Sequence, residues 1–205
     1  MPAPDPDTRA HLEWLGFIQP NGLVVSAPAL VKAGAILNRQ DAEGQGRLAG
    51  CVDQRAVVAG GDPEPCVRDF REFASTVLGW GFSSKGYAGT EEAPVPDDLT
   101  VVLPDYGETL RPDFAVRERD PQNGAPPWQL LVQVLNAAQE FDKATTGSGG
   151  LEASPHGRAE RLLRGTGVPA GVLFNGVAFR LISAPRGESS GWMDFRFADL
   201  INTAG

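Results

Sequence analysis

Two polar residues near the middle of the chain, Asp113 and Gln133, have the types and spacing to bind a divalent metal ion. Asp113 belongs to a Pro-Asp pair in the stretch 110–116, and Gln133 lies inside the apolar run 128–135. Both stretches are expected to form strands, joined by a polar turn. Because Mg²⁺ prefers oxygen ligands, side chains on two neighbouring strands can hold the ion against a scissile phosphate. The pair therefore predicts a metal site for phosphodiester hydrolysis.

Such a site also needs a positive charge, and the position where it is expected is occupied by Leu135. A lysine two residues past the second ligand would point the same way out of the strand and stabilise charge on the phosphate. A structural interpretation competes with the catalytic one. Asp113 would turn the chain at the start of a strand, and Gln133 would be a hydrogen-bonded polar residue in a core strand. This stretch, taken alone, favours the structural interpretation.

A third acid is available from the stretch 63–80, which the spacing of its apolar residues predicts to be one long helix. Asp69 and Glu72 lie on or beside its apolar face, so either of them could project toward Asp113. The competing interpretation is that both are solvated charges on a helix surface, and the pattern favours it.

A basic stripe is expected on the helix that starts after Ser154, because Arg158, Arg161 and Arg164 recur every three residues. Such a stripe can contact DNA phosphates. Cations near a helix C-terminus also complement the helix dipole, which requires no DNA.

Composition limits the classes of function. The formal charge is −8, from 26 acidic and 18 basic residues, which argues against a free-standing, non-specific nucleic-acid binder. Cys51 and Cys66 form no CxxC pair and have no nearby histidine, so a zinc site is not expected. The chain shows no run of 18 apolar residues and no apolar leader, which predicts a cytoplasmic protein.

The periodicity and the turn residues predict an α/β fold with a mixed central sheet flanked by helices. We expect an N-terminal helical extension at 1–62 and a core at 63–205, which together form one compact domain. The expected elements before the Asp113 strand are a helix capped by Asp7 or Thr8 that ends before Pro20, a helix at 28–37, a loop at 38–50 and a strand at 99–103 that pairs with the Asp113 strand. Those after it are a turn at 120–124, a short helix at 136–143, a helix that begins at Pro155 with Gly165 just past its end, strands at 168–174 and 177–184 joined by a type I′ turn at Asn175-Gly176, and a closing segment at 193–201.

Several short motifs, taken in order, resemble one family. They are Leu78-Gly79-Trp80, Arg111-Pro112-Asp113-Phe114, Leu130-Leu131-Val132-Gln133-Val134, Leu162-Leu163-Arg164, Gly167-Val168-Pro169, Phe174-Asn175-Gly176 and the stretch 184–191. Over roughly the last two-thirds of the chain, this order is similar to the N-terminal nuclease-like region of type IIG and IIL restriction-modification proteins, including methyltransferase-bearing components of bacterial phage-defence systems.

The resemblance implies a PD-(D/E)xK nuclease core that acts on DNA with Mg²⁺. Asp113 corresponds to the metal-binding acid, Gln133 stands where the second acid belongs, and Leu135 stands where the lysine belongs, so two motif positions depart from the pattern. Lys143 could replace the missing cation from the segment that follows. The resemblance also implies a methyltransferase or another defence subunit as partner. A nuclease fold that has lost its activity and serves as a docking scaffold is the alternative.

Overall fold

The computed structural model describes residues 5–38, 40–57, 61–83, 85–120, 127–147 and 150–202. The helices are α1 (Pro6–Ile18), α2 (Ala27–Lys32), α3 (Ala42–Cys51), α4 (Phe70–Thr76), α5 (Pro155–Thr166) and α6 (Phe197–Asn202), with two short 3₁₀ helices, η1 (Asp97–Leu99) and η2 (Pro104–Tyr106). The strands are β1 (Asn21–Gly22), β2 (Val52–Val57), β3 (Pro63–Val67), β4 (Tyr87–Ala88), β5 (Val101–Leu103), β6 (Glu108–Leu110), β7 (Phe114–Arg117), β8 (Trp128–Val134), β9 (Thr145–Thr146), β10 (Glu152–Ala153), β11 (Ala170–Phe174), β12 (Ala178–Ser183) and β13 (Gly191–Arg196). No helix within these described residues is both long and apolar enough to cross a membrane.

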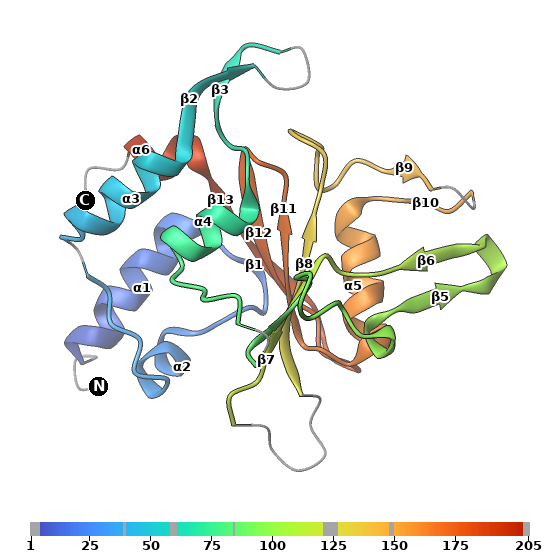
Figure 1. Ribbon diagram of the computed structural model, residues 1–205. Helices are drawn as coiled ribbons and strands as arrows, with labels where there is room; N and C mark the ends of the chain where they lie inside the picture. The colour runs from blue at the N-terminus through green and yellow to red at the C-terminus, as the bar shows by residue number, and fades with distance from the viewer. Residues whose placement is uncertain are drawn as a thin grey trace.

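A seven-stranded mixed sheet forms the centre of the molecule, with strand order β1-β13-β12-β11-β8-β7-β4 (Figure 1). All neighbouring strands are antiparallel except β8 and β11, which run parallel and are joined through α5. In Figure 1, α5 covers one face of the sheet, and α1, α2, α3, α4 and α6 lie on the other side. The expected α/β fold with helices on both sides of a mixed sheet is confirmed.

Each face of the sheet carries its own apolar core. The α5 core contains Leu131, Leu162 and Leu173, whereas the α4 core contains Phe73 and Phe197 on the opposite face. Each of these side chains is at most 2% exposed. Burial of one such side chain stabilises the fold by about 1.5–3 kcal/mol. The helices are therefore held mainly by apolar contact with the sheet.

The helix α5 follows from local chemistry. The Ser154 hydroxyl accepts a hydrogen bond from the Gly157 N–H at 3.1 Å, and Pro155 occupies the first turn, as predicted. The end of the helix was predicted two residues too early. Gly167, with a φ of 81°, forms the left-handed C-cap, whereas Gly165 lies inside the helix against Val101.

The predicted helix at 63–80 is wrong in its first part. Residues 63–67 form strand β3, and the helix begins only at Phe70, because the Asp69 side chain accepts hydrogen bonds from two backbone N–H groups at that point. Val67 contributes to the α4 core from the strand, so its spacing from Phe70 imitated a helical repeat. The predicted loop at 38–50 is also wrong, because Asp41 caps α3 there.

Three further local predictions fail for identifiable reasons. The strand β5 pairs with β6 and not with the Asp113 strand, because η2 and Gly107 turn the chain sharply between them. The segment 136–143 is not helical: Ala138 has a φ of 56°, and Asn175 hydrogen-bonds to Gln139. The turn after β11 is not type I′, since it has a positive φ only at Gly176. Most of the predicted 120–124 turn lies outside the described residues.

The N-terminal segment contributes directly to the body of the molecule. Leu48 of α3 and Val52 of β2 belong to the same α4 core as Phe73. Strand β1 pairs with the sheet edge β13. Residues 42–57 are thus built into the core rather than attached beside it.

Candidate functional site

The β7–β8 hairpin brings Asp113 next to Gln133. Phe114 pairs with Val132 across the hairpin, and the Asp113 N–H donates to the Val132 carbonyl at 2.8 Å. The Asp113 side chain then accepts a hydrogen bond at 2.6 Å from the Val134 N–H, which belongs to the peptide bond after Gln133. The carboxyl group thereby continues the hydrogen-bond ladder beyond the start of β7. This geometry matches the structural role considered for Asp113.

The environment of the Asp113 carboxyl is nevertheless unusual. The residue is exposed, but neighbouring protein atoms displace water from its carboxyl, and this desolvation raises its pKa above the ordinary value. The hydrogen bond from Val134 acts in the opposite direction and is the weaker influence. A nearby cation stabilises the ionised form of a desolvated carboxyl group, so this position has one property of a metal ligand.

The position expected for a catalytic cation holds an apolar residue, and the alternative cation, Lys143, is paired with another side chain. Leu135 is half-buried and packs against the α5 core, as an apolar side chain in that place should. Lys143 is 70% exposed and pairs with Glu140 at 3.4 Å. That partner is three residues away, and such exposed pairs bind weakly. Among the described residues, the hydrogen-bond and ion-pair partner of the Lys143 side chain is Glu140.

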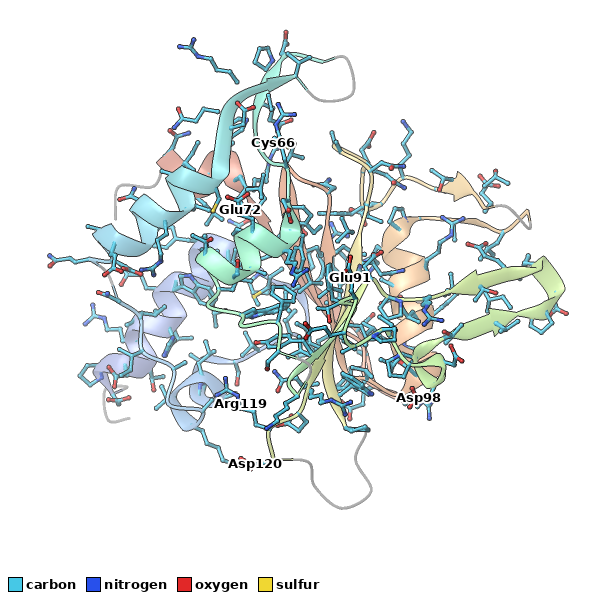
Figure 2. The ribbon with its side chains drawn as sticks, in the orientation of Figure 1. Cys66, Glu72, Glu91, Asp98, Arg119 and Asp120 are labelled. Atoms are coloured by element: carbon cyan, nitrogen blue, oxygen red, sulfur yellow. The ribbon has the colours of Figure 1, made fainter. Side chains whose placement is uncertain are left out.

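Glu72 does not reach Asp113. Helix α4 packs its buried residues against the face of the sheet opposite α5. Leu131 belongs to the α5 core, and side chains two residues apart on a strand point to the same face, so Gln133 points toward the α5 side. Glu72 faces Cys51 instead and contributes to the raised pKa of that thiol, although desolvation is the larger cause. Figure 2 shows Glu72 on α4, away from the β7–β8 hairpin. Asp69 is committed to capping α4.

A further acid that the sequence analysis did not consider lies in a turn beside the start of β7. The turn 90–93 folds against the start of β7, and a Cβ atom on Gly89 would overlap the Asp113 carbonyl oxygen. Glu91 lies in that turn, near the middle of the sheet in the view of Figure 2. Across the described parts of the chain, no three His, Cys, Asp or Glu side chains are grouped closely enough to hold a metal ion.

The basic stripe divides into one structural arginine and two exposed ones. The Arg158 Nε–H donates to Glu108 at 2.9 Å, and its remaining donors bind oxygens of Thr145, Leu151 and Ala153. Arg158 therefore has no free N–H group for a phosphate. Arg161 and Arg164 are exposed on α5.

A second charged cluster was invisible to motif reasoning. Arg180 of β12 is almost completely buried and forms paired hydrogen bonds with Asp142 and Asp194. It also lies between the rings of Phe141 and Trp192, at 5.0 and 5.2 Å from their centroids. The cluster pins the 136–144 segment to the sheet. No short motif could have revealed it, since its members come from three separate parts of the chain.

Comparisons with protein-family models, curated proteins and solved structures found no match.

Proposed function

We propose that this chain is a nuclease-like domain of a bacterial restriction-modification or phage-defence protein whose cleavage centre is degenerate, and that it serves in the cytoplasm as a docking scaffold for a methyltransferase or another defence subunit. The observation that carries the proposal is the order of elements around the β7–β8 hairpin. Helix α4, the antiparallel strands β4, β7 and β8, the crossover helix α5 and the parallel strand β11 occur in this order, with the β5–β6 ribbon inserted between β4 and β7. Asp113 lies at the β7–β8 hairpin beside Gln133.

Degeneracy is supported by what surrounds this pair. Mg²⁺ is usually held by one or two carboxylates, but here one of the two ligands is a neutral amide. Asp113 completes a strand ladder, and an apolar Leu135 occupies the position of the cation. Arg158 is unavailable for DNA. A weak metal site without a nearby cation provides little stabilisation for an attacked phosphodiester.

A docking role is supported by exposed apolar side chains in the N-terminal layer, defined as residues 5–38. Phe17, Leu23 and Ile36 are 79%, 75% and 86% exposed, and Leu12 is 52% exposed. Four large apolar side chains exposed within one layer fit a surface that a partner covers. The partner proposed for this layer is the methyltransferase part of the same system.

The test is plasmid nicking together with calorimetric titration of Mn²⁺. We expect no cleavage and no saturable Mn²⁺ binding by the wild-type chain, and both should appear in the Gln133→Glu, Leu135→Lys double variant. Adding Asp113→Ala should abolish them again. Leu135→Met is the matched control for packing, and circular dichroism checks that each variant is folded. Mg²⁺-dependent nicking by the wild-type chain would refute degeneracy.

The second candidate function is an active divalent-metal endonuclease, favoured by the desolvation of Asp113 next to Gln133. Here Asp113 would hold the ion, Gln133 would add its amide oxygen, and Arg161 and Arg164 would contact the DNA backbone. In this case wild-type nicking would fall at least about tenfold in Asp113→Asn. A loss in Glu91→Gln but not in Glu72→Gln would identify the third acid.

A further inference from the structure

A cavity of about 630 Å³ lies between the N-terminal layer and the sheet. Its floor is the α4-core face of the strands, and its roof comes from α1, α2 and the segment between them. The lining includes Trp14, Leu30, Trp80, Val172, Leu181 and Phe195. Among the described residues, no charged side chain lines it. This composition and size fit the apolar body of a small ligand.

The cavity is present because α1 and α2 do not pack closely against the sheet. Helix α1 fully buries only His11, while Leu12 and Phe17 on the same helix face solvent. Below it, Leu181 and Phe195 remain half-buried in the middle of the sheet. Apolar sheet surface that stays partly wet in the interior gains free energy when an apolar ligand covers it.

A neighbouring cavity has a more polar lining. A second cavity, of about 370 Å³, shares Val24, Val25 and Ser183 with the first. Its other lining residues include Ser26, Ser189 and the exposed carboxylate of Glu188. This second cavity therefore offers oxygen acceptors and one negative charge.

Glu188 is available for a ligand. It forms no ion pair with a described residue. The nearby Arg186 is turned away, because its guanidinium donates to the carbonyl oxygens of Arg164 and Gly165 at the end of α5. An ammonium group has three N–H donors and one positive charge, which match a carboxylate and neighbouring hydroxyl oxygens.

From this arrangement we infer a binding site for a small amphipathic amine, with its apolar chain or ring between the N-terminal layer and the sheet and its ammonium group at Glu188. The site lies on the sheet face opposite the one toward which Gln133 points, although Leu130 of β8 contributes to its lining. It does not depend on the proposed function.

The probe is decylamine, compared with decanoate of the same chain length. Trp14 and Trp80 line the cavity, so tryptophan emission reports occupancy directly. We expect a saturable emission change with decylamine and at least about tenfold weaker binding of decanoate, because the carboxylate would face Glu188. Circular dichroism at each concentration checks that the protein remains folded.

Two variants make the result specific. Glu188→Gln should weaken decylamine binding severalfold and leave decanoate binding equal or tighter, whereas the control Asp98→Asn, at an exposed acid far from the cavity, should change neither. Val172→Phe fills the cavity and should abolish the saturable change. Equal affinity for the two probes, no effect of Glu188→Gln, or no saturable binding by the wild-type chain would each overturn the assignment. Glu188→Gln alters only an exposed side chain, so this test remains valid even if Val172→Phe fails to fold.

Discussion

At the scale of single residues, Asp113 combines a structural hydrogen bond with an unfavourable charge. Its carboxyl closes the strand ladder at Val134, yet loss of water around it raises its pKa. A carboxamide could accept the same hydrogen bond without carrying a charge. The charge is therefore not needed for this hydrogen bond.

Asp113→Asn is expected to leave the melting temperature unchanged or to raise it at neutral pH. Because the pKa of Asp113 is raised on folding, the group favours the folded state below its ordinary pKa, and this contribution is lost as pH rises through the raised value. The Asn variant does not lose stability in this way, so its melting temperature should increase relative to that of the wild type from acid to neutral pH. Thermal melts across that range measure the difference. A marked destabilisation at neutral pH would show that the charge itself supports the structure.

At the scale of elements, α5 anchors two ribbons to the sheet. Arg158 reaches β6 through Glu108 and the β9–β10 ribbon through backbone oxygens. Both side chains of the ion pair are nearly buried, at 13% and 11% exposure. Removal of one partner from such a pair leaves an unpaired buried charge.

Arg158→Met should destabilise the protein by about 3–5 kcal/mol. The matched control Arg161→Met, at an exposed position on the same helix, should stay within about 0.5 kcal/mol of the wild type. Urea denaturation measures both. Equal, small effects would mean that Arg158 does not hold the ribbons.

The contact between α5 and β5 depends on the absence of a side chain at Gly165. A Cβ atom there would overlap the methyl groups of Val101. Alanine improves helix propensity by about 1 kcal/mol over glycine, but overpacking costs about 1–3 kcal/mol.

Gly165→Ala should therefore be neutral or destabilising, despite its better helix propensity. In a Val101→Ala background the same change should become stabilising, and a coupling of about 1 kcal/mol or more is expected from a double-mutant cycle. Additive effects in urea melts would disprove the close packing of helix and ribbon.

At the scale of the whole molecule, Arg180 joins three segments that are distant in sequence. Asp142 lies 38 residues before it and Asp194 lies 14 residues after it. The hydrogen bond from Arg180 holds the pKa of Asp142 below its usual value. The cluster couples the crossover segment to the centre of the sheet.

Arg180→Met should cost about 1–3 kcal/mol at neutral pH, because it removes hydrogen bonds to two charged groups, while the carboxylates left behind are 66% and 41% exposed and keep their hydration. The lowered pKa of Asp142 means that its contribution is present above its ordinary pKa and is lost as pH falls. The difference in unfolding free energy between Arg180→Met and the wild type should therefore become smaller at acid pH. Arg68→Met, which removes an exposed pair with Asp53, should leave the stability nearly unchanged. A difference that is independent of pH would contradict this account.

The sequence by itself determined the elements whose signals are local. The Ser154-Pro155 start of α5, the apolar run of β8 and the mixed α/β class could all be read from caps and periodicity, because these depend on neighbours within a few residues. Proximity of Asp113 to Gln133 was also predictable, since one short hairpin joins their strands.

Only the tertiary structure decided the rest. Apolar spacing does not distinguish Val67 in a strand from Phe70 in a helix when both enter one core, so the helix at 63–80 was misjudged. Packing between distant segments decides which face of the sheet α4 covers, and this placement separates Glu72 from Gln133. The same holds for the commitment of Arg158 to Glu108 and for the cavity under the N-terminal layer, because long-range contacts leave no periodic trace in the chain.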